Sequence, residues 1–128
     1  RIIIGIKKFM KKISLLAALF CSSTAFAVCN TNMNQTDLNI CSMNEYKKAD
    51  QELNKVYAAY TAKLNNARKN QVKAVQLNWI KYKESDCKYE ASAYEGGSIQ
   101  PLIQNSCLTK KTKLRTQELQ AYLAEENR

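Results

Sequence analysis

Acidic side chains are the residues of this chain that could carry catalytic chemistry. Four of them lie close together in the second half of the sequence: Glu84, Asp86, Glu90 and Glu95. In a glycosidase, two carboxylates at a fixed distance in space serve as acid and base. The spacing of these four residues along the sequence does not define such a distance. The chain also contains no histidine, which is the usual base for a nucleophilic serine or cysteine. We therefore expect a protein that is not an enzyme.

The cysteines predict disulfides rather than a metal or redox centre. Four of them follow residue 27: Cys29, Cys41, Cys87 and Cys107. Without a Cys-x-x-Cys pair or a histidine, zinc binding and thioredoxin-like exchange lack their usual residues. An even number of cysteines in an exported chain is typical of structural disulfides, and four cysteines allow three pairings. We expect no cofactor and no metal.

A second polar group is expected to stabilise the fold. Asp50 and Asn54 are four residues apart, so they share one face of a helix. We predict that Asp50 forms a buried ion pair with Arg115, with Asn54 and Gln76 around it. Such a pair would fix the register of the helices, which indicates a structural role.

Helices must position these residues, because the sequence offers little else. After residue 27 the only glycines are Gly96 and Gly97 and the only proline is Pro101, so the strong helix breakers share one segment. Alternating β-branched runs and Asn-Gly turns are absent. The sequence predicts an all-α fold: a small antiparallel helical hairpin or bundle of about three helices, stapled by two disulfides.

Apolar residues recur every three or four positions along the first two expected helices. The first helix begins with Thr36 as its N-cap, and its apolar face holds Leu38, Cys41, Tyr46, Ala49, Leu53, Val56, Tyr60 and Leu64. Asn65, Asn66 and Asn70 mark its end, although one continuous helix through them is an alternative. The second helix covers 71–91, and its face holds Val72, Val75, Trp79, Tyr82, Asp86 and Tyr89.

The third expected helix follows the break at Gly96 and Gly97. Ser98 can cap it and Pro101 falls in its first turn, where a missing N–H costs nothing. Its face is expected to hold Ile103, Cys107, Leu114, Glu118 and Ala121.

The helix model also predicts how the cysteines pair. If the second and third helices fold back on each other at the glycines, Cys87 and Cys107 each lie about two turns from the bend and meet side by side. Cys29 then pairs with Cys41. Each bridge would close a loop of about 10 to 20 residues, for which chain entropy predicts roughly 3 kcal/mol of stabilisation.

Residues 10–27 have the layout of a bacterial secretory signal: a charged start, an apolar run and a small-x-small cleavage site ending at Ala27. We expect translation to start at Met10, and residues 1–27 to be an upstream extension plus the signal peptide. Residues 28–128 would then form a single domain, periplasmic or secreted. The alternative, a membrane anchor, is interrupted by lysines and falls short of the roughly 20 apolar residues that a span needs, so we expect no stable membrane anchor.

Removal of this leader changes the charge of the protein. The leader holds five of the 20 basic residues (Arg1, Lys7, Lys8, Lys11 and Lys12) and none of the 11 acids, so the formal charge falls from +9 to +4. The high pI therefore gives little support to nucleic-acid binding. The remaining positive charge would suit contact with anionic wall polymers or lipid head groups, and with peptidoglycan as a partner, but a solvated basic surface is the more common explanation.

A set of residues in a characteristic order extends along most of the domain. It comprises Cys41, Tyr46, Asp50, Leu53, Asn54 and Tyr57, then Gln76, Trp79, Tyr82, Lys83 and Cys87, then Gly96-Gly97-Ser98, Cys107, Thr112, Arg115, Glu118 and Leu119. This set resembles the LprI N-terminal-domain family of small exported helical proteins, named after a mycobacterial lysozyme inhibitor. Lys83 stands where the family pattern usually has arginine, so a bidentate donor is replaced by a point charge.

The resemblance implies an exported binding module that inhibits a lysozyme. Such an inhibitor needs a protruding polar or basic group that enters the cleft between the two catalytic acids. We expect the turn from Tyr94 to Gln100 to make this contact through Tyr94, Glu95 and Ser98, with Lys88 nearby. The alternatives are an immunity protein for a periplasmic toxin and a structural factor associated with the cell envelope.

Overall fold

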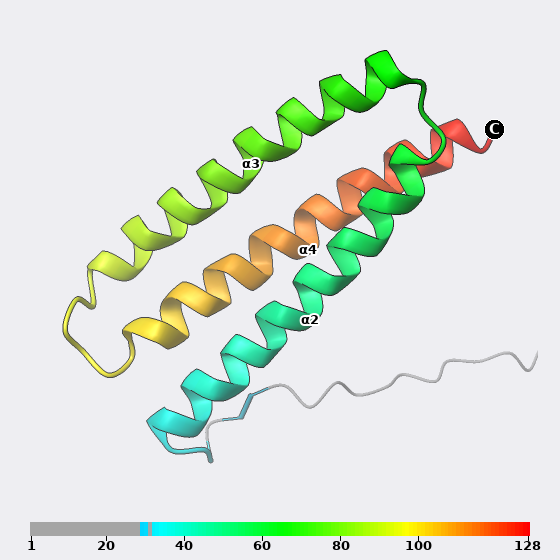
Figure 1. Cartoon of the computed structure of the whole chain (residues 1–128). Helices are drawn as coiled ribbons and strands as arrows, with labels where there is room; N and C mark the ends of the chain where they lie inside the picture. Colours follow the sequence, from blue (N-terminus) through cyan, green and yellow to red (C-terminus); the bar gives the residue numbers. More distant parts are fainter. Residues whose placement is uncertain (1–28, 31) are drawn as a thin grey trace, which may run out of the picture.

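The computed structural model describes residues 29, 30 and 32–128, and within these residues it contains three helices and no strand. They are α2 (Gln35–Thr61), α3 (Asn66–Ser92) and α4 (Gln100–Glu126), each 27 residues long (Figure 1). The all-α prediction with about three helices is therefore confirmed. The predicted extension and signal peptide lie outside the described residues. None of these three helices has an apolar stretch long enough to cross a membrane.

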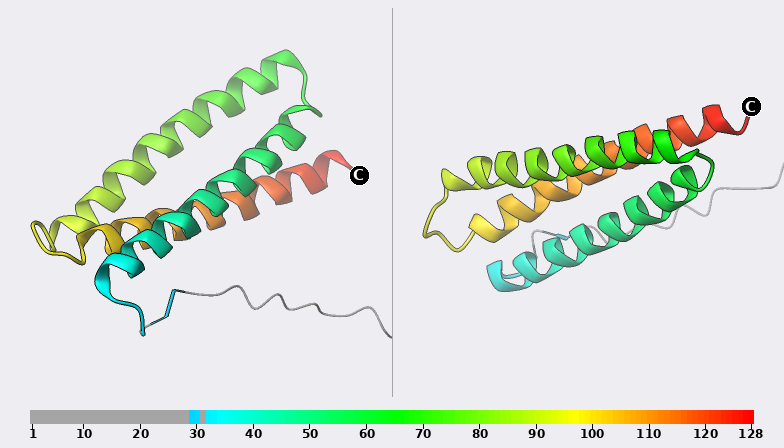
Figure 2. Two further views of the ribbon diagram at one scale, coloured as in Figure 1. Left: turned by 60° about the horizontal axis from the view of Figure 1, so that its bottom comes forward. Right: turned by 45° about the horizontal axis from the view of Figure 1, so that its top comes forward.

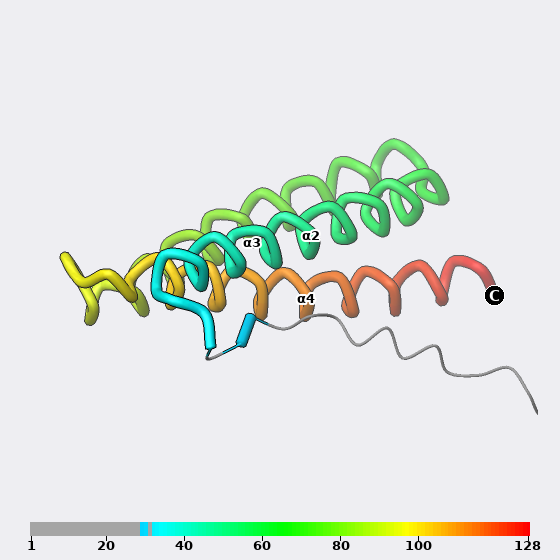
Figure 3. Tube along the Cα trace, turned by 90° about the horizontal axis from the view of Figure 1, so that it is seen from below, coloured from blue at the N-terminus to red at the C-terminus, as the bar shows by residue number. Residues whose placement is uncertain are grey.

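The chain reverses direction at both connections, so α3 runs opposite to α2 and α4 (Figures 1 and 2). Helix α4 packs against both α2 and α3, whereas α2 and α3 make few direct contacts. Seen from below, α2 and α3 lie on the same side of α4 (Figure 3). Helix α4 is therefore the centre of the bundle, and the backbone of α3 lies close to α4 but not to α2.

An asparagine side chain caps the N-terminus of each of the first two helices. The side chain of Asn34 accepts a hydrogen bond from the backbone N–H of Asp37 at 2.8 Å, and that of Asn65 accepts one from Arg68 at 2.9 Å. Each bond satisfies a backbone donor that has no partner within the helix. The first two helices are therefore separate, as predicted, but the N-cap of α2 is Asn34 rather than Thr36, and α3 begins at Asn66 rather than near residue 71.

The predicted cap of the last helix is wrong. The N-cap of α4 is Ile99, which makes no side-chain cap hydrogen bond, while Pro101 does lie in the first turn. Ser98 instead belongs to the preceding turn, and its carbonyl accepts a hydrogen bond from the side chain of Asn39 on α2 at 2.9 Å.

The apolar core lies where α2 crosses the C-terminal half of α4. Its buried members are Leu53, Val56, Tyr60, Leu64 and Leu119, with Tyr57, Val72, Trp79 and Leu123 packed around them. The predicted apolar face of α2 is thus largely the face that is buried.

The faces predicted for α3 and α4 are only partly the buried ones: Val72 and Trp79 pack against the core and Cys107 is buried, but other members are not. On α3, Val75, Tyr82 and Tyr89 are exposed, and the buried residues are Gln76, Lys83, Cys87 and Ala91. On α4, Leu114 and Glu118 are exposed, and the buried residues include Thr112, Arg115 and Thr116. Two of these buried polar groups bond across helices: Arg115 of α4 donates to Gln76 of α3, and Lys83 of α3 donates to Tyr46 of α2. Thr116 instead donates to the Thr112 carbonyl of its own helix.

Both disulfides join the cysteines that the helix model pairs. Cys29 and Cys41 have a Cα–Cα distance of 5.8 Å, and Cys87 and Cys107 one of 5.5 Å. The first bridge ties the segment before α2 to that helix. The second joins α3 to α4 in the interior, where Cys87 and Cys107 are buried and pack against Leu108 and Tyr46.

Candidate partner-binding surface

The turn between α3 and α4 projects at the end of the bundle opposite the C-terminus (Figure 1). Gly96 has a φ of +76°, a left-handed conformation that glycine adopts without steric cost. The Gly97 N–H donates to the Tyr94 carbonyl at 2.9 Å, and the Gln100 N–H donates to the Gly97 carbonyl at 3.2 Å. These bonds order the backbone of the turn.

The four residues predicted to contact a partner are all exposed: Tyr94, Glu95, Ser98 and Lys88. The first three lie together in this turn, and Lys88 lies on the last part of α3. The turn is also tied to α2 through the bond between Asn39 and the Ser98 carbonyl. The structure thus presents these side chains on an ordered backbone.

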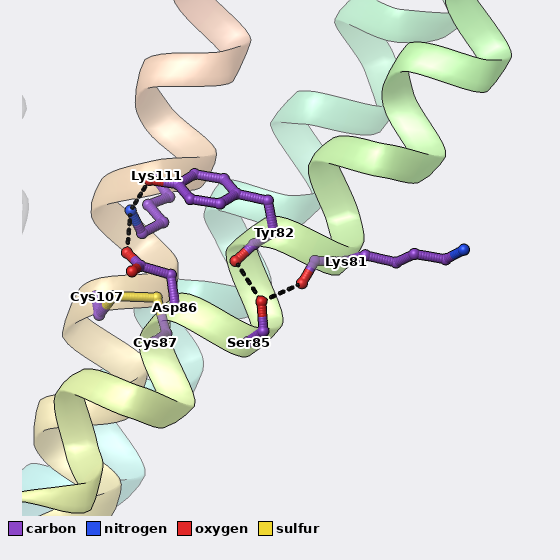
Figure 4. Close-up of polar contacts among 7 residues, drawn as sticks. All are labelled: Lys81, Tyr82, Ser85, Asp86, Cys87, Cys107 and Lys111. Atoms are coloured by element: carbon purple, nitrogen blue, oxygen red, sulfur yellow. Dashed lines mark hydrogen bonds and ion pairs between the residues drawn. A yellow bond between two sulfur atoms is a disulfide. The ribbon is translucent and has the colours of Figure 1, made fainter.

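A lysine on α4 holds a tyrosine and an acid of α3 in place (Figure 4). The Nζ of Lys111 lies 2.7 Å from Asp86 Oδ2, donates to the Tyr82 hydroxyl at 3.1 Å and lies 4.6 Å from the centre of the Tyr82 ring. The hydrogen bonds to Asp86 and then to Tyr82 raise the pKa of Lys111 above its ordinary value. The sequence pattern placed Tyr82 and Asp86 in the core, so this surface cluster was missed.

The predicted ion pair between Asp50 and Arg115 is not formed. The Nε of Arg115 donates to Gln76 Oε1 at 3.0 Å, and its Nη1 lies 2.7 Å from Glu118 Oε2. Asp50 instead accepts a hydrogen bond from Asn54 at 3.3 Å. The reason is local: Glu118 lies one turn from Arg115 on the same helix, whereas Asp50 is partly exposed on α2. The predicted cluster is therefore two separate pairs.

Lys83 is a buried cation that the sequence pattern missed, although the family resemblance singles out its position. It is 3% exposed, and its Nζ donates to the Tyr46 hydroxyl at 2.8 Å. The same atom lies 5.2 Å from the centre of the Tyr46 ring and 4.9 Å from that of Trp79. In the described part of the chain no carboxylate lies within ion-pair distance of it. Cation–π contact and one hydrogen bond therefore stabilise its charge.

Residues of the family pattern from two helices converge on one groove between α2 and α3, with a volume of about 550 Å³. The residues of the pattern that line it are Tyr46, Asp50, Leu53, Asn54 and Tyr57 from α2 and Gln76, Trp79 and Lys83 from α3. The backbones of α2 and α3 are close at few positions. The two helices are therefore connected mainly by these side chains.

Replacing Lys83 by alanine should therefore lower the free energy of unfolding by about 2 kcal/mol. The variant loses a hydrogen bond from a charged donor and two cation–π contacts. Urea denaturation followed by circular dichroism would measure the change. Lys81→Ala, on the exposed side of the same helix, is the matched control and should change stability by less than about 0.5 kcal/mol. Equal midpoints for the two variants would contradict a stabilising role for Lys83.

The fold and the turn define a small, disulfide-linked helical protein with an ordered, exposed turn at one end. In the residues described, no group of three His, Cys, Asp or Glu side chains could hold a metal ion. The chain belongs to the lysozyme inhibitor LprI family, whose model matches residues 28–119.

It is also similar to an uncharacterised protein of Rhizobium meliloti (strain 1021), with 33% identity over 104 residues that cover 71% of this chain and 75% of the relative. No solved structure matches the chain significantly.

Proposed function

We propose that this protein is an exported, periplasmic or secreted inhibitor of a lysozyme. The observation that carries the proposal is the family match over residues 28–119, because the family is described as a lysozyme inhibitor. The two disulfides support it, since bridges of this kind persist in the oxidising space outside the cytoplasm. The predicted signal peptide agrees with the same location.

In this proposal the protein inhibits by blocking the substrate cleft of its target and does not itself catalyse a reaction. The turn from Tyr94 to Gln100 enters the cleft, where the Ser98 hydroxyl and the Lys88 ammonium group donate to carboxylates of the enzyme. Its backbone is already held by hydrogen bonds, so binding has less conformational entropy to lose. The formal charge of +4 without the leader would slow association with a strongly basic lysozyme. We therefore expect the best target to carry little positive charge.

The test is an inhibition assay with the purified, oxidised protein against lysozymes of differing net charge. At least one enzyme should be inhibited at micromolar concentration or below. If none is, the proposed function is wrong. Capture of a toxin or of peptidoglycan from an envelope extract would then favour the immunity protein or the structural factor.

Replacing Glu95 and Ser98 together by alanine should weaken inhibition roughly tenfold, because loss of interface contacts worth about 1.4 kcal/mol changes affinity by that factor. Both side chains are exposed, so the helical circular dichroism signal should not change. Glu52→Ala, at an exposed position of α2, is the control and should inhibit like the wild type. Unchanged inhibition by the turn variant would show that the enzyme binds elsewhere.

A further inference from the structure

The outward face of α3 carries a repeated dipeptide. Lys81-Tyr82 and Lys88-Tyr89 are seven residues apart, so the two pairs lie on the same side of the helix about 10.5 Å from each other. Val75 continues the row seven residues before Tyr82. All five residues are exposed, with 52% of Val75, 56% of Tyr82 and 76% of Tyr89 open to solvent. We call this row the α3 tyrosine ridge.

In the described part of the chain, the ridge stays exposed although the Lys111 side chain of α4 contacts Tyr82. Helix α3 packs through the side that holds Gln76, Lys83, Cys87 and Ala91. Ser85 lies between the two ridge tyrosines and Ser92 one turn after Tyr89. Their hydroxyls donate to backbone carbonyls of α3: Ser85 to Lys81 at 2.9 Å and Ser92 to Tyr89 at 2.6 Å. The small side chains beside the tyrosines therefore do not cover them.

The ridge is held in position from beneath. Lys111 contacts both the hydroxyl and the ring of Tyr82 and pairs with Asp86, next to the Cys87–Cys107 disulfide (Figure 4). Tyr82 nevertheless remains more than half exposed. A tyrosine that is ordered before binding loses less conformational entropy in a complex.

We propose that the α3 tyrosine ridge is the surface of this protein that lies along the substrate cleft of its lysozyme, an inference that rests on the proposed function. A glycan cleft is long and carries two carboxylates. The ridge is straight, about 21 Å from Val75 to Tyr89, and offers aromatic faces, tyrosine O–H donors and two lysines. The ammonium groups of Lys81 and Lys88 complement the carboxylates of the enzyme.

Two features favour an enzyme cleft as the occupant. Asp86 lies about one turn from both ridge tyrosines and is already paired with Lys111, so it does not oppose a carboxylate of the partner. The ridge also leads along α3 towards the turn that begins at Tyr94, so ridge and turn can engage one target together. An apolar row at helical spacing is the usual way in which a helix binds a groove, and tyrosines are frequent hot spots of such interfaces.

The test compares Tyr82→Ala/Tyr89→Ala with the wild type against a lysozyme that the wild type inhibits. The assay uses a small soluble chromogenic oligosaccharide as substrate. We expect the inhibition constant to rise at least thirtyfold, because one hot-spot residue alone contributes about that factor. Leu77→Ala, which removes an equally exposed apolar side chain of α3 that lies off the ridge, should stay within about twofold. Circular dichroism would establish that all variants fold.

A second measurement tests the position in the cleft. Chitotriose, an oligosaccharide that occupies such clefts, should compete with the inhibitor for the enzyme. If wild type inhibits but the tyrosine variant inhibits equally, or if chitotriose does not compete, the ridge proposal is overturned while the proposed function stands. If the wild type inhibits no lysozyme, both the proposed function and the ridge proposal are wrong. Binding of peptidoglycan that depends on the tyrosines, without inhibition on the soluble substrate, would identify the ridge as a glycan-binding surface instead.

Discussion

Replacing Cys87 and Cys107 together by serine should lower the free energy of unfolding by about 3 to 5 kcal/mol. The bridge closes a loop with a sequence separation of 20, for which chain entropy alone predicts roughly 3 kcal/mol. The rest comes from placing two hydroxyl groups where the sulfur atoms are buried. The effect should be large because the backbone of α3 lies close only to α4, and this bridge is the one covalent link between the two helices in the described residues. Urea denaturation of the oxidised protein and of the variant measures it.

The matched control is Cys29→Ser with Cys41→Ser. This bridge has a sequence separation of 12 and joins α2 to the segment before it. Without it that segment gains freedom in the folded state as well as in the unfolded one, so the net loss should be smaller. Equal losses for the two double variants would contradict the view that α3 depends on its bridge. The wild-type protein should add no alkyl group in a native mass measurement, and any alkylated cysteine among the four would contradict the paired state.

Arg115→Ala should lower the free energy of unfolding by about 3 kcal/mol. Arg115 is 5% exposed, and its loss leaves Gln76 Oε1 buried without its donor, which costs about 1 to 3 kcal/mol. Removal of the apolar stem of the arginine also leaves a cavity between α3 and α4. Thermal and urea unfolding of the variant would measure both contributions together.

Asp50→Ala is the informative control for that variant. If Arg115 is satisfied by Gln76 and Glu118, loss of Asp50 should change stability by less than about 1 kcal/mol, since it removes only the bond from the exposed Asn54. An equally large loss for Asp50→Ala would mean that the two residues do interact, against the geometry found.

In the proposed mode of binding, stability and binding are linked through α3. The same helix carries the tyrosine ridge and leads into the turn, and one disulfide and the contacts of Lys111 hold it on α4. We expect a variant without the α3–α4 bridge to bind a target more weakly even at temperatures where it is folded, because a loosened helix must be ordered again on binding.

The sequence by itself determined the architecture and the bridges. Glycines and the proline confined to one segment after residue 27 leave only helices on either side, and the bend that they require brings Cys87 opposite Cys107. The face of α2 was also predictable, because its apolar residues form a single strong stripe. The position of the exposed turn follows from Gly96 and Gly97 for the same reason.

Only the tertiary structure decided the rotation of α3 and α4. Helix α3 has apolar side chains on more than one side, so its periodicity does not distinguish Val75, Tyr82 and Tyr89 from the face that is buried. Gln76 and Arg115 can lie inside because they bond each other across α3 and α4, and Lys83 can because it bonds Tyr46 of α2. Each of these bonds joins two helices. Burial of a polar residue depends on such partners, and a partner's position is known only when all three helices are in place.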